Sequence, residues 1–247
     1  MTELWSAETG PDDGPVVVLV HGSMDRSTGM LALARQLDHQ WRVVRYDRRG
    51  YARSSHDGPF DVADQVADLW RIVGDRRVVL FGHSYGGNVA LAASVERPEQ
   101  VAGVAVYETP TPWVDWWPRR SAALQAVGST DPAAAGEAFM RRLIGDARWE
   151  ALPERTRATR RAEGRVMVAE LADLRHRAPW QADRVTVPVV AGFGSLGAPH
   201  HRDAMTRLAA EVPNARVVEL DGCGHDAPTA HAAMVAERLI APFDRAV

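Results

Sequence analysis

A serine in the middle of a glycine-rich pentapeptide is the residue of this chain best placed for nucleophilic chemistry. Gly82-His83-Ser84-Tyr85-Gly86 follows an apolar run and precedes a run of small residues. An apolar strand, a tight turn and a helix, with serine in the turn, form the context in which this G-x-S-x-G spacing presents a nucleophile. The flanking glycines permit a strained turn, and the start of the following helix favours developing negative charge. We therefore predict that Ser84 attacks an acyl carbon.

A serine hydroxyl is a poor nucleophile without a base, and His225 is the best-placed base among nine histidines. It lies in Asp221-Gly222-Cys223-Gly224-His225-Asp226, a loop expected at the carboxyl end of the last strand. Because the carboxyl ends of parallel strands share one edge of a sheet, His225 and Ser84 can meet despite their separation. His83 is expected to point away from the nucleophile, and His21 to shape a loop beside the site.

A tetrahedral intermediate needs two N–H donors for its oxyanion. The N–H of Tyr85, the residue after the nucleophile, is the first candidate. The second is the N–H of Ser23, in the loop that follows His21-Gly22. We expect Met24 to line the same wall of the site.

The elements that must position these residues alternate between strands and helices. Such alternation predicts an α/β fold, with a mostly parallel central sheet flanked by helices on both faces. The predicted strands are Leu4–Thr9, Pro15–Val20, Trp41–Tyr46, Val78–Phe81, Val101–Tyr107, Val187–Phe193 and Arg216–Leu220. The predicted core helices are Met30–Leu37, Val62–Val73 with Asp61 as its cap, a helix from Asn88, one after Pro199, and His231–Phe243.

Residues 111–183 carry no strand signal and read as an α-helical lid inserted into a core of residues 1–110 and 184–247. Three helical segments are expected there: Arg119–Val127, Pro132–Ile144 and Pro153–Arg177. The tryptophans Trp113, Trp116 and Trp117 lie where this insertion begins. They are predicted either to pack the lid onto the core or to line an apolar substrate pocket.

The bulk composition excludes several classes of protein. The chain has 247 residues, a net charge of −3 and one cysteine. A net charge this small does not favour nucleic acid or an anionic membrane as the main partner, and one cysteine cannot form an internal disulfide. No apolar run is long enough to span a bilayer, and residues 1–15 do not resemble a signal peptide. We expect a cytoplasmic protein with a small-molecule substrate; the sequence does not indicate its oligomeric state.

Four motifs in register resemble those of the α/β-hydrolase superfamily, in particular its small serine esterases with a helical lid. They are His21-Gly22, the segment Asp47–Ser54, Gly82–Gly87 and Gly222-x-Gly224-His225. The resemblance covers the chain except the helical insertion. One departure is Ala52, where relatives often carry glycine.

The acid that should orient the histidine departs from the family pattern. Relatives usually place aspartate after the next-to-last strand, where this chain has Ser195 in Gly192–Pro199. Some members instead use a carboxylate after the strand that follows the nucleophile helix, and Glu108 occupies that position here. We assign Glu108 as the acid. Asp203 is the main rival, and Asp226 or a serine–histidine dyad without an acid also stay open.

Two further clusters of residues have a structural interpretation as well as a functional one. His200, His201 and Asp203 could suggest a metal site, but adjacent histidines point in different directions, and no metal is expected. The basic run Arg155, Arg157, Arg160 and Arg161 is typical of a solvated helix face, with attraction of anionic substrates as the alternative.

Together these residues predict a cofactor-free serine hydrolase that cleaves a carboxylic ester or similar acyl substrate through an acyl-enzyme on Ser84. A serine at this position argues against the haloalkane dehalogenases and epoxide hydrolases of the superfamily, which use aspartate there. Carbon–carbon bond hydrolysis, lyase or acyltransferase chemistry on the same residues is an alternative. So is a non-catalytic protein that binds a small ligand.

Overall fold

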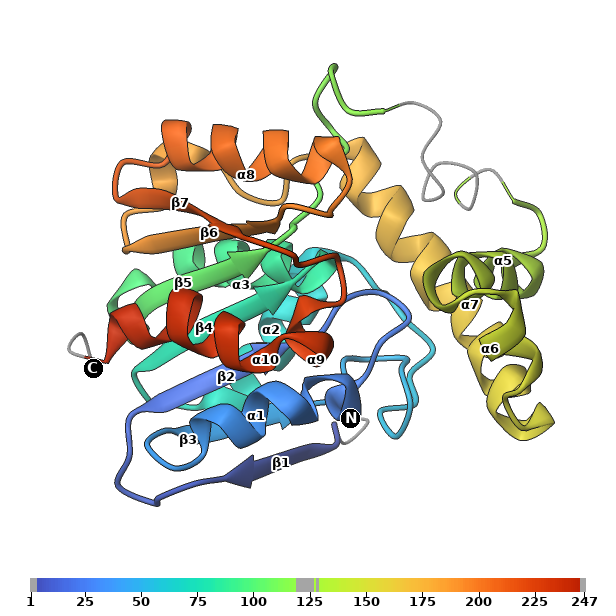
Figure 1. The fold of residues 1–247 in the computed structure, drawn as a ribbon, viewed down its shortest axis with the longest axis horizontal. Coiled ribbons are helices and arrows are strands. Elements are labelled where there is room, and N and C mark those ends of the chain that lie inside the picture. Colours follow the sequence, from blue (N-terminus) through green and yellow to red (C-terminus); the bar gives the residue numbers. More distant parts are fainter. Residues whose placement is uncertain (1–3, 119–126, 128, 245–247) are drawn as a thin grey trace.

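One sheet of seven strands runs through the protein, seen in a computed structural model that describes residues 4–118, 127 and 129–244 (Figure 1). The strand order is β1-β3-β2-β4-β5-β6-β7. The edge strand β1 is antiparallel to β3, and the other neighbours are parallel, as predicted. The strands are β1 Ser6–Thr9, β2 Val16–Val20, β3 Arg42–Tyr46, β4 Val78–His83, β5 Val101–Tyr107, β6 Val189–Gly194 and β7 Ala215–Leu220.

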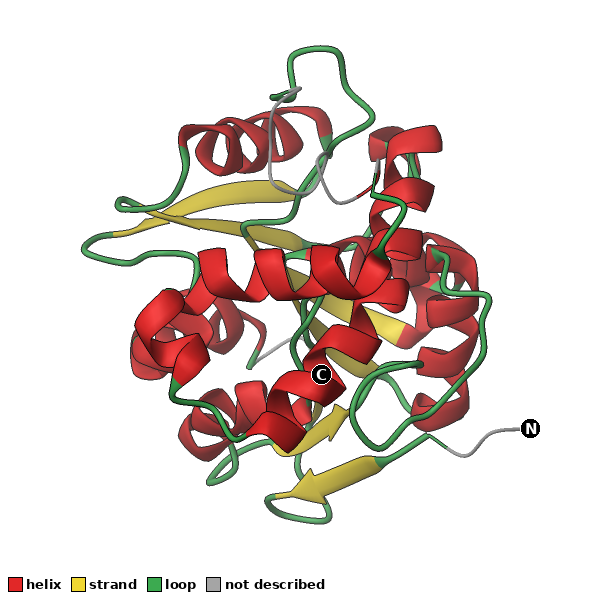
Figure 2. Ribbon diagram, turned by 90° about the vertical axis from the view of Figure 1, so that its right-hand side faces the viewer, coloured by secondary structure: helices red, strands yellow, loops and turns green. Residues whose placement is uncertain are grey.

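Helices cover both faces of the sheet, so its central strands are apolar throughout (Figure 2). Side chains alternate along β2: Val18 and Val20 belong to the apolar core that also includes residues of α2, α3 and α8. Val17 and Leu19 belong to the core on the opposite face, with residues of α1 and α10. The helices are α1 Leu31–Leu37, α2 Val62–Val73, α3 Tyr85–Glu96, α5 Pro132–Ile144, α6 Asp146–Glu150, α7 Glu154–His176, α8 Pro199–Glu211, α9 Ala227–Ala230 and α10 Ala232–Val235.

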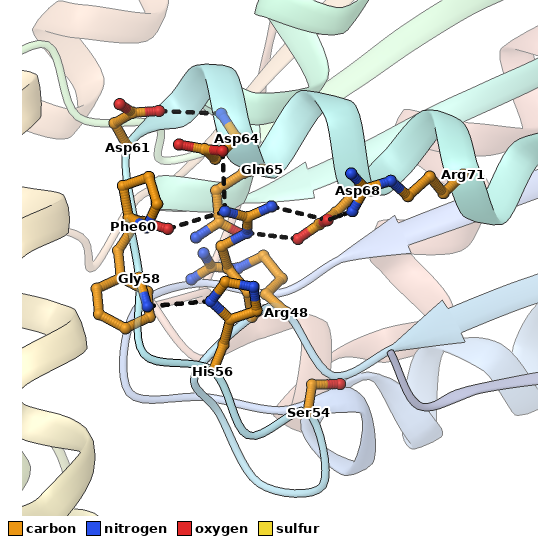
Figure 3. Close-up of polar contacts among 12 residues, drawn as sticks. Arg48, Ser54, His56, Gly58, Phe60, Asp61, Asp64, Gln65, Asp68 and Arg71 are labelled. Carbon is orange, nitrogen blue, oxygen red and sulfur yellow. Dashed lines mark hydrogen bonds and ion pairs between the residues drawn. The ribbon is translucent and has the colours of Figure 1, made fainter. Parts of the chain in front are cut away.

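The start of α2 confirms the capping prediction. The Asp61 carboxylate accepts a hydrogen bond of 2.9 Å from the N–H of Asp64 (Figure 3). That bond satisfies one of the N–H groups that a helix start leaves without a partner. Because α2 is thereby fixed at its first turn, it presents Val66, Leu69 and Val73 to the sheet.

The C-terminal segment is less regular than predicted. The single helix expected over His231–Phe243 is divided into α10, a π-helical turn at Ala236–Ile240 and a 3-10 turn at Ala241–Phe243. Pro242 lies in the last turn, and because proline has no N–H it cannot continue an α-helical ladder. The segment nevertheless covers the sheet through Val235, Leu239 and Phe243.

Helices α5, α6 and α7 lie beyond the carboxyl ends of the parallel strands (Figure 1). The predicted helices Pro132–Ile144 and Pro153–Arg177 match α5 and α7, α6 was not predicted, and Arg119–Val127 falls outside the described residues except for Val127. At Gly164 the two long helices approach closely, since a Cβ there would lie 2.0 Å from the carbonyl oxygen of Pro132. No helix in the described ranges is both long enough and apolar enough to cross a bilayer.

Candidate active site

Ser84 occupies a strained turn between β4 and α3. Its backbone has φ 52° and ψ −123°, a conformation rare for any residue other than glycine. The turn is tightly packed: a Cβ on Gly86 would lie 2.2 Å from the carbonyl oxygen of Val20, so only glycine fits. The N–H of Ser84 donates to the carbonyl oxygen of Tyr107 at 2.9 Å. The end of β4 is thereby held beside the end of β5, where the predicted acid follows.

Glu108 and His225 form a hydrogen-bonded pair. The Nδ1 of His225 lies 2.6 Å from Oε2 of Glu108, whose side chain is fully buried. The other carboxylate oxygen accepts a 3.0 Å hydrogen bond from the N–H of Gly194. With Glu108 as acceptor, Nδ1 carries a proton and leaves Nε2 of the neutral ring as a base. Glu108 has φ 48°, so its backbone is strained like that of Ser84.

The side chains of Tyr107 and His83 hold the loop that carries His225 in place. The hydroxyl of Tyr107 donates to the carbonyl oxygen of Gly224 at 2.7 Å. Nε2 of His83 lies 2.9 Å from the carbonyl oxygen of His225 and donates to it. Burial, and then the charge of His225, lower the pKa of His83 well below its ordinary value. His83 therefore supports the loop in its neutral form.

The rival acids lie in other surroundings. The hydroxyl of Ser195, where relatives usually carry aspartate, contacts Oδ1 of Asp221 at 3.1 Å. Asp203 is half exposed on α8 and pairs with its neighbour Arg202 at 3.5 Å. Asp226 is exposed to solvent. Of the carboxylates considered, Glu108 is the one bonded to His225.

The loop after β2 and the first residue of α3 each bring one N–H group to the nucleophile, that of Ser23 and that of Tyr85. A Cβ on Gly22 would lie 3.1 Å from the Cβ of Ser84, so this loop touches the turn. Ser23 and Tyr85 line the same pocket as Ser84 and His225. Within the described part of the chain, the N–H groups of Ser23 and Tyr85 have no hydrogen-bond acceptor. Such free donors suit a developing oxyanion.

A buried ion pair ties this loop to helix α7. Arg48 donates to the carbonyl oxygen of Gly22 at 3.0 Å and forms a charge-assisted hydrogen bond with Glu170 of α7. Glu170 also accepts hydrogen bonds from the hydroxyls of Ser23 at 2.6 Å and Tyr51 at 2.8 Å. Burial would lower the pKa of Arg48, but the charge of Glu170 reverses the effect and raises it, so the buried guanidinium is charged.

A mainly apolar pocket of about 460 Å³ opens in front of Ser84. Its apolar walls are Pro110, Pro112, Trp117, Pro118, Phe139 and Leu171. Trp117 is therefore at the pocket, as one interpretation of the sequence predicted. Trp113 and Trp116 do not line this pocket. Together with Trp180 and part of α8, they line a different hollow. Met24 is also absent from the pocket wall, since its side chain is buried against α7.

The imidazole of His201 stacks on that of His225, with ring centroids 5.0 Å apart and an interplanar angle of 22°. Glu108, His201 and His225 each offer a metal-ligand atom within 4.8 Å of the others. However, stacked rings direct their nitrogen lone pairs into nearly parallel planes, and Glu108 already accepts the N–H of His225. The geometry fits a hydrogen-bonded pair with a neutral ring above it better than it fits a metal centre. Burial lowers the pKa of His201 well below its ordinary value, which keeps that ring uncharged.

The chain belongs to the alpha/beta hydrolase family, whose family model matches residues 17–238. A magnesium-chelatase 30 kDa subunit from Rhodobacter capsulatus is 27% identical over 90% of this chain and 84% of its own length. A serine hydrolase-like protein from Danio rerio is 38% identical over 43% of this chain. That second match spans only 35% of the zebrafish protein.

Solved structures repeat the fold over nearly the whole chain. An esterase from Thermogutta terrifontis superposes with a TM-score of 0.74 at 23% identity, covering 96% of this chain and 91% of that one. An enol-lactonase from Burkholderia xenovorans LB400 gives a TM-score of 0.73 at 22% identity, covering 98% and 96%. At these identities the likeness establishes the shared fold.

Sequence reasoning missed the buried pair Arg48 and Glu170, and also the pocket residues Phe139, Arg142 and Leu171. Glu170 interrupts an apolar stripe of α7, because Val166, Met167, Leu171 and Leu174 are all buried around it. A carboxylate at that spacing on a buried helix face is costly unless it is paired. This was the signal that could have found it. Arg48 gave no such signal, since three arginines lie within Arg48–Arg53 and nothing local distinguishes the buried one.

Proposed function

We propose that this protein is a serine hydrolase that cleaves a carboxylic ester, or a similar acyl compound, through an acyl-enzyme on Ser84. One observation carries the proposal: Ser84 shares a pocket with a histidine whose Nδ1 is bonded to a buried carboxylate. A neutral imidazole held in that tautomer is the base that a serine nucleophile requires.

In the proposed reaction Ser84 Oγ attacks the carbonyl carbon while Nε2 of His225 accepts the hydroxyl proton. Glu108 orients the ring and stabilises the imidazolium that forms. His225 then passes the proton to the leaving alcohol, and the carbonyl re-forms as the acyl-enzyme. Water then attacks the acyl carbon while His225 accepts its proton. As the bond from the acyl carbon to Ser84 Oγ breaks, His225 returns that proton to Oγ, and the acid is released. Side chains and water supply every group, so we expect no cofactor.

The negative charge of each tetrahedral intermediate falls on the carbonyl oxygen. The N–H groups of Ser23 and Tyr85 are the proposed donors to it, because both residues line the pocket and neither N–H has an acceptor among the described residues. Removal of one such donor in other enzymes costs about a hundred- to a thousandfold in kcat. The mainly apolar walls favour an acyl or alcohol part with hydrocarbon character, and thus a carboxylesterase-like specificity.

The test is hydrolysis of p-nitrophenyl butyrate by the wild type, Ser84→Ala and a matched control, Ser55→Ala. Ser55 is an exposed serine outside the pocket, so its variant is expected to retain wild-type kcat/KM. Ser84→Ala is expected to lose at least about a thousandfold in kcat with an unchanged circular dichroism spectrum. Turnover retained by Ser84→Ala would refute the assignment. A folded wild type that cleaves no ester would instead favour a ligand-binding protein.

A further inference from the structure

The described wall of the pocket in front of Ser84 carries positive charge and no negative charge. Of the residues described as lining it, none is acidic, and Arg142 is the only arginine. His200 and His201 also face the pocket, but burial lowers the pKa of each, so both imidazoles are neutral near pH 7. Glu108 lies behind His225 and is not part of the wall. Among the described residues of this wall, the permanent charge is therefore the guanidinium of Arg142.

Arg142 is also free, unlike the arginines around it. Arg141, next to it on α5, is bonded to Glu137 and Asp146. Arg161 of the basic run in α7 is bonded to Glu137, also at the surface. By contrast, Arg142 has no ion pair or hydrogen bond with any residue of the described ranges. An exposed guanidinium at an apolar pocket, without a carboxylate of its own, is suited to bind an anionic group of a ligand.

Apolar side chains make up much of the pocket wall that Ser84 and Arg142 share. Phe139 lies one turn before Arg142 on the same side of α5, and both residues line the pocket. Leu171, Trp117 and three prolines add to the apolar lining. A ligand that reaches from Ser84 to Arg142 would thus place a hydrocarbon segment against these side chains and a charge at the rim.

We infer that the preferred substrate is an ester that carries a carboxylate, separated from the ester bond by an apolar segment, and that Arg142 binds this carboxylate. The inference rests on the proposed function and makes its substrate class specific. The guanidinium would form paired N–H···O bonds with the two carboxylate oxygens. The arginines of α7, considered above as a possible attraction for anions, are mostly engaged in ion pairs and do not line the pocket.

Two series of esters test this, with the carboxylate on the acyl side or on the alcohol side. The acyl series compares p-nitrophenyl half-esters of adipate and suberate with the neutral hexanoate and octanoate esters of equal chain length. The alcohol series compares acetate esters of ω-hydroxy acids with acetates of the matching alcohols, followed by pH-stat titration. The measured quantity is the ratio of kcat/KM for the anionic ester to that for its neutral partner.

The wild type is expected to prefer the anionic ester in at least one series, and Arg142→Gln to lower that ratio by about three- to tenfold. Arg142→Lys should restore part of it, and added salt should weaken the preference of the wild type. Arg148→Gln, which removes another exposed arginine that is not among the residues lining the pocket, should leave the ratio as it is. A ratio that Arg142→Gln leaves unchanged in both series overturns the subsite while the hydrolase stands.

Binding without turnover separates the two proposals. Suberate should bind the Ser84→Ala protein in isothermal titration calorimetry, and Arg142→Gln in that background should weaken binding by a similar factor. Equal affinity for the two proteins, or binding to neither, overturns the subsite. Absence of turnover for every ester, with suberate binding that depends on Arg142, would overturn the hydrolase and retain the anion subsite.

Discussion

Substitution of Glu170 by glutamine removes the charge that balances a fully buried arginine. Both side chains of the Arg48–Glu170 pair have 0% exposure, so water cannot reach the guanidinium that remains. Glutamine keeps the shape of glutamate but supplies one acceptor oxygen in place of two. Ser23, Tyr51 and Gln65, which all donate to Glu170, would compete for that oxygen with Arg48.

The size of the effect follows from this burial. Loss of one partner of a buried ion pair costs about 3–5 kcal/mol, because the other charge stays buried without compensation. Arg48 retains hydrogen bonds to the carbonyl oxygens of His21 and Gly22, which places the expected loss near 3 kcal/mol. A domain stable by about 5–15 kcal/mol would still fold at low temperature, so the loss is measurable.

The assay is urea unfolding monitored by circular dichroism, with Glu150→Gln as the matched control. Glu150 also pairs with arginines, at 2.6 Å in the case of Arg157, but its side chain is 55% exposed. Exposed pairs contribute about 0–1 kcal/mol, so the control should lower the unfolding free energy by no more than that. Equal losses in the two variants would contradict the reasoning. Because the hydroxyl of Ser23 is bonded to Glu170, kcat for ester hydrolysis should fall in Glu170→Gln as well.

Two further predictions concern the acid and the buried histidines. Glu108→Gln should lower kcat for p-nitrophenyl butyrate by at least about a hundredfold, since it removes the carboxylate bonded to His225, whereas Asp203→Asn should change it less than twofold; the reverse order would move the acid to Asp203. Burial holds the pKa values of His21, His83 and His201 well below that of an exposed histidine. As pH falls below about 6.5, these histidines bind protons in the unfolded chain but not in the folded chain. The unfolding free energy should therefore fall by up to about 1.4 kcal/mol per pH unit for each histidine. Stability that is flat or increasing from pH 7.5 down to 5.5 in urea titrations would count against this burial.

The sequence was sufficient for the elements whose signals are local. The apolar run before Ser84 and the glycines around it are a few residues long, and they correspond to β4 and its turn. Asp61 caps α2 through a residue only three positions away. Glu108 was predicted from the family resemblance, because Ser195 stands where relatives usually carry aspartate and some members use a carboxylate at the position of Glu108. In the structure Glu108 is hydrogen-bonded to His225.

Such local signals do not predict contacts between segments that are distant in the sequence. Glu170 meets Ser23 across 147 positions of sequence, and only the packing of α7 against the β2 loop decides that they touch. The tryptophans illustrate the same limit. Trp113 and Trp117 are the same type of residue and lie four positions apart. Trp113 lines a hollow beside α8, whereas Trp117 lines the pocket of Ser84. Because this segment is irregular, the spacing of its residues does not predict which tryptophan lines the pocket.

The most direct test of the central claim is the site of covalent labelling by a fluorophosphonate, located by peptide mass spectrometry. The account predicts one adduct, on the peptide that contains Ser84, formed more slowly by Glu108→Gln and absent from Ser84→Ala. Folded wild-type protein that forms no adduct, or forms it on another residue, would contradict the claim that Ser84, His225 and Glu108 act together.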